Sequence, residues 1–105
     1  MELRETSGNF EVDHLQHFLQ RVTTLVDSGF SEDEILQIQT AAESMPIDSK
    51  KHWEFPIDFK GTPTSLGITL FMDETEFPEV SFLTHPDLAE TIDQQMTSFF
   101  KEIAG

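Results

Sequence analysis

The chain has 105 residues, with 20 Asp and Glu against 6 Lys and Arg, which gives a formal charge of −14 at neutral pH. This length is typical of one domain, and a hydrophobic fraction of 37% that includes 10 Phe is enough to form an apolar core. Because the chain has no Cys, disulfides, thiolate metal sites and thiol catalysis are excluded. The negative charge disfavours direct binding to nucleic acid.

The first nine residues are polar and contain no apolar run. They resemble neither a signal peptide nor a transit peptide, and no stretch of the chain is apolar enough to span a bilayer. We therefore predict a polar N-terminal leader over residues 1–9 and a single acidic domain over 10–105. The expected location is cytoplasmic, without membrane binding.

Two helices are predicted in the first half of the chain. Over residues 10–27 the apolar side chains recur at helical spacing (Leu15, Phe18, Leu19, Val22, Leu25 and Val26), and Gly29 can adopt the left-handed conformation that closes a helix. Ser31 and Glu34 have the spacing of a capping box, which predicts the start of a second helix. That helix is expected to end before Pro46.

Beyond the second helix the hydrophobic period changes from 3.6 to 2. Residues 52–60 alternate as one strand, and Pro56 places that strand at a sheet edge or at a bulge. Residues 61–65 are interpreted as a turn, followed by alternating strands at 66–72 and 79–83. Three consecutive strands predict an antiparallel meander, with Val80 and Phe82 facing inward in the third.

A last helix is predicted to begin within residues 84–87, with Pro86 in its first turn, and to bury a stripe of apolar side chains (Leu88, Ile92, Met96, Phe99 and Ile103). The predicted order is α-α-β-β-β-α. Three amphipathic helices can cover one face of a three-stranded antiparallel meander, so we predict an α+β fold of two-layer sandwich type.

The opposite face of the predicted sheet is open, and most of its side chains are polar or charged (His52, Glu54, Asp58, Lys60, Thr69 and Ser81). Phe71 and Leu83 interrupt this polar face and are predicted to form a small apolar patch for a partner. Trp53, Phe55 and Phe59 lack a cationic groove for base stacking, and their spacing of two indicates core packing instead.

Few residues have the pattern of a metal or catalytic site. His14 and His17 lie one helical turn apart beside Glu11 and Asp13, but a solvated helix face explains them without a metal. The acids of residues 73–79 lack the spacing of a calcium loop. No nucleophile elbow or phosphate-binding loop is present in the sequence, so we expect no metal, no cofactor and no catalytic residue.

The most distinctive feature is the charge distribution. From Gly61 to Phe100, forty residues contain no Lys or Arg, and they hold seven acids: Asp73, Glu74, Glu76, Glu79, Asp87, Glu90 and Asp93. The last three recur every three residues along the last helix and are expected to lie beside the acidic loop. Such a field accelerates the encounter with a basic partner. The alternative interpretation is that the negative charge serves only to keep the protein soluble.

Three functions are compatible with these patterns. The first is a non-enzymatic protein-binding module, such as an inhibitor, an immunity protein or a nucleic-acid mimic, that masks a basic surface of a partner through the seven acids. The second is a homodimerising adaptor that uses the open sheet face or the edge strand. The third is an enzyme that relies on carboxylates, supported only by the surplus of acids and the four His.

Overall fold

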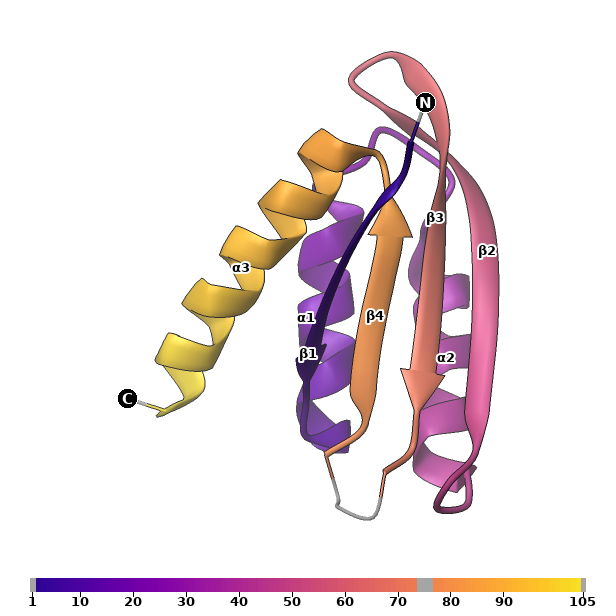
Figure 1. Cartoon of the computed structure of the whole chain (residues 1–105), viewed down its shortest axis with the longest axis vertical. Coiled ribbons are helices and arrows are strands. Elements are labelled where there is room, and N and C mark those ends of the chain that lie inside the picture. Colours follow the sequence, from indigo (N-terminus) through magenta and orange to yellow (C-terminus); the bar gives the residue numbers. More distant parts are fainter. Residues whose placement is uncertain (1, 74–76, 105) are drawn as a thin grey trace.

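A computed structural model describes residues 2–73 and 77–104 of the chain (Figure 1). The elements in chain order are β1 (Arg4–Asn9), α1 (Val12–Thr23), α2 (Glu32–Ser44), β2 (Lys50–Phe59), β3 (Thr62–Phe71), β4 (Glu79–Thr84) and α3 (Pro86–Ala104). The strands form one sheet in the order β1-β4-β3-β2, and every neighbouring pair is antiparallel. The predicted α+β class and the β2-β3-β4 meander are confirmed.

The sheet has a fourth strand that the sequence did not predict. Arg4–Asn9 form β1, which pairs with β4 from Arg4 opposite Thr84 to Asn9 opposite Glu79. The interpretation of residues 1–9 as a polar leader is therefore wrong for residues 4–9, and the domain begins before residue 10. The physical reason is that β1 is stabilised by its pairing with β4 and by contact with α3, because its own side chains contribute little buried apolar area.

The helices begin near the predicted positions. At the N-cap of α2, the side chain of Ser31 accepts from the backbone N–H of Glu34, and the backbone N–H of Ser31 donates to Glu34 Oε2 at 3.1 Å, so the capping box is confirmed. α1 is shorter than the predicted span of 10–27, because the chain leaves the helix after Thr23. Gly29 does have a left-handed conformation, with φ of +99°, but it lies in the connection to α2, where it passes close to β2.

The β2-β3 hairpin is tighter than predicted. Lys60 and Gly61 both have positive φ (51° and 78°), as a two-residue type I′ turn requires, so that Thr62 already pairs with Phe59. The turn predicted at 61–65 is therefore wrong beyond Gly61. Pro63 lies in β3 beyond the end of β4, where no ladder donor is needed. The prediction of an edge strand from Pro56 is confirmed, since β2 lies at the edge of the sheet.

The core lies between the sheet and the helices. The inward side chains of β3 and β4, including Leu66, Ile68 and Phe82, are fully buried, as is Leu15 of α1. On the opposite face of the sheet, no helix of the described residues is present (Figure 1). As predicted, α3 begins at Pro86, and the backbone N–H of Asp87 donates to His85 Nδ1 at 3.1 Å.

Candidate functional site

The structure separates the predicted acidic residues into two groups. Asp73 and Glu79 lie where β3 leads into β4, and Glu74 and Glu76 lie outside the described residues. Asp87 follows the other end of β4, and the two ends of this strand, Glu79 and Thr84, are about 17 Å apart. The expectation that the last helix presents its acids beside the acidic loop is therefore wrong, because α3 begins at the far end of the sheet (Figure 1).

The three predicted acids of α3 have different surroundings. Asp87 and Glu90 are exposed, and neither has an ion-pair partner among the residues that the structure describes. Asp93 is also exposed, but its Oδ1 accepts a hydrogen bond of 2.9 Å from Thr6 Oγ1 and so links α3 to β1. Asp87 and Glu90 are thus the carboxylates of this helix that are most available to a partner.

A charged pair lies toward the other end of α3. Arg21 Nη2 donates to Glu102 Oε1 at 2.6 Å, and this hydrogen bond raises the pKa of Arg21 and lowers the pKa of Glu102. The Arg21 guanidinium also lies 5.0 Å from the centre of the Phe99 ring. The ion pair links α3 to α1, so neither Arg21 nor Glu102 is available to a partner.

The open sheet face does not unite Phe71 and Leu83. Phe71 is opposite Glu79 and Leu83 is opposite Gly67, so the two apolar side chains are separated along the strands by about 14 Å. Both are half-buried. The predicted single apolar patch is therefore two separate positions, with the pair Thr69 and Ser81 between them.

Phe71 belongs to a hollow of about 370 Å³ in the open face, which is lined by Glu5, Lys50, Thr69, Phe71, Glu79 and Ser81. The lining thus combines one ammonium, two carboxylates and two hydroxyls with the Phe71 ring. Beside the hollow, His52 Nδ1 and Thr69 Oγ1 share a hydrogen bond of 2.8 Å. The hollow is thus lined mainly by polar and charged side chains, with Phe71 as the aromatic one.

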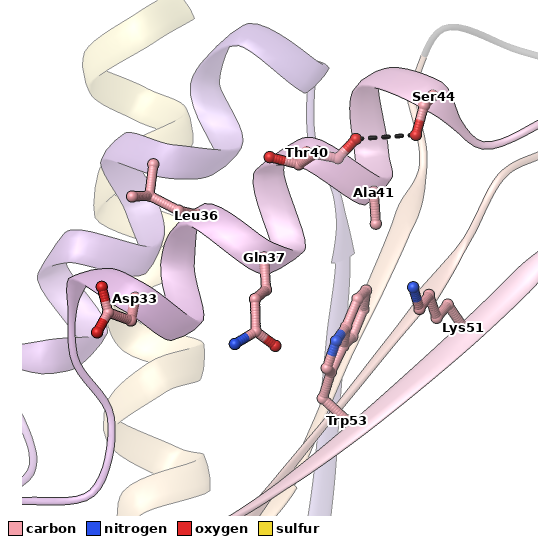
Figure 2. Close-up of a pocket in the computed structure, with 8 residues that line it drawn as sticks. All are labelled: Asp33, Leu36, Gln37, Thr40, Ala41, Ser44, Lys51 and Trp53. Carbon is pink, nitrogen blue, oxygen red and sulfur yellow. Dashed lines mark hydrogen bonds between the residues drawn. The ribbon is translucent and has the colours of Figure 1, made fainter.

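A larger groove lies between α2 and β2, and sequence reasoning missed it. It has a volume of about 600 Å³, and its lining includes Asp33, Leu36, Gln37, Thr40, Lys51 and Trp53 (Figure 2). The predicted core residue Trp53 is only half-buried, and in Figure 2 its indole extends from β2 toward α2. The edge position indicated by Pro56 was the signal in the sequence that β2 had a free side.

His14 and His17 lie one turn apart in α1. His14 Nδ1 lies 3.2 Å from Glu11 Oε2, and its ring meets Phe99 edge-on, with 6.4 Å between ring centres. His17 is exposed. Within residues 2–73 and 77–104, no group of three His, Asp or Glu side chains is arranged to hold a metal ion.

No helix in the described part of the chain is both long and apolar enough to cross a membrane. Comparisons of the chain with family models, with curated proteins and with solved structures find no match.

Proposed function

We propose that the protein is a non-enzymatic protein-binding module that uses the carboxylates of α3 to cover a basic surface of a partner protein. The observation that carries this proposal is the exposure of Asp87 and Glu90 without an ion-pair partner in the described residues. Both lie in the forty-residue segment that contains no Lys or Arg.

Repulsion among the carboxylates supports this function. Unpaired like charges repel one another and lower the stability of the compact state, whereas a cationic partner removes that repulsion on binding. The same field accelerates the encounter with such a partner and disfavours acidic competitors. An inhibitor or immunity-type protein, or a mimic of the nucleic-acid backbone, would act in this way.

The proposal is tested with the tagged full chain in a lysate of its host, washed at low and at high salt, with mass spectrometry of the retained proteins. We expect the wild type to retain a basic protein that salt releases. The Glu90→Lys variant should no longer retain this basic protein. The matched control Glu79→Lys makes the same charge change at the end of β4 that is remote from α3, and it should still retain the basic protein.

The captured partner then allows a kinetic test of the same surface. Glu90→Lys should slow association by about tenfold while changing dissociation much less, because exposed charges act mainly on the encounter. Equal association rates for Glu90→Lys and Glu79→Lys would contradict a binding surface on α3.

A homodimeric adaptor is the second candidate, because no helix in the described part of the chain covers the open face of the sheet and Phe71 lies half-buried in its hollow. This function predicts self-association that rises with concentration and is lost in Phe71→Ser. Sedimentation at several concentrations distinguishes the two functions, since a monomer throughout excludes the dimer.

A further inference from the structure

We propose that the groove between α2 and β2 binds an extended peptide, which joins the sheet as a new antiparallel strand beside β2. The peptide carries a basic residue, then an apolar residue, then an acidic residue, in this order from its N-terminal end. This inference goes beyond the proposed function, because it uses α2 and β2 rather than the carboxylates of α3.

The backbone of β2 leaves hydrogen-bonding groups available on its outer side. The N–H of Asp58 donates to Ser28 O at 3.1 Å, and the carbonyl of Asp58 accepts from the N–H of Asp27 at 2.8 Å. The backbone N–H and C=O groups of Asp58 therefore point away from β3. Because these directions alternate along a strand, His52 and Glu54 also present their N–H and C=O groups outward. No described backbone group bonds to them on that side.

The connection between α1 and α2 closes the outer side of β2 only at its far end. This loop bonds to Asp58 and also brings Gly29 close to Pro56. A Cβ at Gly29 would lie only 2.2 Å from the carbonyl oxygen of Pro56. From Lys50 to Glu54, over about 14 Å, no backbone group of the described residues bonds to this edge. That length accommodates a short extended segment, which gains affinity from main-chain hydrogen bonds.

The groove gives such a segment a place for alternate side chains. Trp53 and Lys51 face the helices, so a peptide residue opposite either of them directs its side chain into the groove. Leu36 of α2 is 50% exposed there, and the Lys51 ammonium lies 5.4 Å from the centre of the Trp53 ring (Figure 2). An apolar side chain opposite Trp53 would cover the exposed part of its indole.

The charges at the two ends of the groove select the order of the peptide. Lys50 and Lys51 lie at the start of β2, whereas Asp33 lies in the first turn of α2, near the end where Phe30 contacts Phe55. An antiparallel strand runs toward Lys50. Its N-terminal basic residue therefore approaches Asp33, and its later acidic residue lies opposite Lys51 as a cross-strand pair.

A second copy of this chain fits the edge less well. Antiparallel pairing of two β2 strands with Trp53 opposite Trp53 places Phe55 opposite Lys51, so the inward-facing lysine has no carboxylate opposite it. An inward charge of this kind opposes pairing with an unrelated apolar strand. In addition, each copy carries a formal charge of −14. Charge complementarity thus favours the peptide.

The test uses two capped peptides of identical composition, Ser-Thr-Lys-Thr-Phe-Thr-Glu-Thr-Ser and its reverse, Ser-Thr-Glu-Thr-Phe-Thr-Lys-Thr-Ser. Neither contains Trp, and Trp53 is the only Trp of the full chain, so its emission reports on the groove directly. We expect the first peptide to shift this emission and to bind about tenfold more tightly than the reverse peptide, since the reversal changes two attractive contacts into repulsive ones.

A matched pair of variants locates the contact. Lys51→Glu should weaken binding of the first peptide by roughly fivefold and remove its advantage over the reverse peptide. Lys101→Glu changes the net charge equally, but it lies exposed in the last turn of α3, and it should leave both affinities within about twofold. Circular dichroism of each variant verifies its fold, and the comparison of the two peptides on the wild type needs no variant.

Several results would overturn the proposal. They are equal affinities for the two peptides, tighter binding of the reverse peptide, and no change in Trp53 emission up to about 1 mM peptide. Equal losses of peptide affinity in Lys51→Glu and Lys101→Glu would show that net charge, and not the groove, determines binding. A shift of Trp53 emission with protein concentration alone would identify a second copy as the occupant. None of these results bears on Glu90, so the groove and the α3 surface fail or succeed separately.

Discussion

The two edges of the sheet meet their neighbouring helices in different ways. At the β1 edge, α3 approaches so closely that a side chain at Gly8 would begin 3.1 Å from Met96 Sδ, and Thr6 hydrogen-bonds Asp93 of the helix. At the β2 edge, α2 stands apart and leaves a groove of about 600 Å³. The helix α3 therefore packs closely against the strand at one edge, whereas α2 leaves a groove beside the strand at the other.

The inward residues of each strand explain this difference. At β1 they include Gly8, which has no side chain to hold α3 away. At β2 they include Lys51, whose ammonium must stay in contact with water, and the large indole of Trp53. Burying a lysine beneath α2 without a carboxylate would cost more free energy than the added burial of apolar surface could offset. The side chains of Lys51 and Trp53 thus favour a gap between α2 and β2.

Deletion of residues 2–9 should have the largest effect, because it removes the strand that pairs with β4 and packs against α3. Without β1, the hydrogen-bonding groups of β4 and the packed face of α3 become exposed. We expect the free energy of unfolding to fall by about 3 kcal/mol or more, measured by urea denaturation. An unchanged midpoint would mean that these residues are a dispensable leader. Ser7→Ala, on the exposed side of β1, should cost about 0.5 kcal/mol or less.

Gly29→Ala tests the contact that limits the open edge. The residue has φ of +99°, and a Cβ there would overlap the carbonyl oxygen of Pro56, so the loop must move away from β2. The expected loss in unfolding free energy is about 2–4 kcal/mol. Gly61→Ala is the matched control: its φ is also positive, at +78°, but a Cβ there meets nothing within 4 Å, so about 1 kcal/mol is expected. Equal losses would show that strain alone, without the clash, sets the cost.

A smaller effect concerns the acidic end of the groove, where α2 begins. Hydrogen bonds from Ser31 lower the pKa of Glu34. The ionised carboxylate therefore stabilises the fold above its unfolded-state pKa, and this contribution disappears as the pH falls through the lower folded-state pKa. Glu34→Gln should lose about 0.5 kcal/mol at pH 7 and show a shallower loss of stability on acidification. Parallel pH–stability curves for the two proteins would contradict this role.

The sequence predicted those elements whose own residues carry a clear pattern. The alternation from Trp53 to Phe59 indicated β2, and Pro86 indicated the start of α3. β1 has no such pattern, because its inward positions include Thr6 and Gly8, and its stability depends on partners distant in the chain. A local pattern cannot report a strand that gains most of its burial from its neighbours.

The candidate surfaces were predictable only in part. The carboxylates of α3 were visible as charge, but their separation from Glu79 depends on the direction in which α3 leaves the sheet. The edge position of β2 followed from Pro56. The groove did not, because it depends on how far α2 stands from Trp53, and tertiary packing sets that distance.

The contrast between the two edges is tested most directly by amide hydrogen exchange of the full chain, measured by NMR with and without the peptide Ser-Thr-Lys-Thr-Phe-Thr-Glu-Thr-Ser. The alternation that turns the N–H groups of His52 and Glu54 outward also places those of Glu5 and Ser7 on the outer side of β1. We predict that the peptide slows exchange at His52 and Glu54 and leaves Glu5 and Ser7 unchanged. Slowed exchange at β1, or none at β2, would contradict the account.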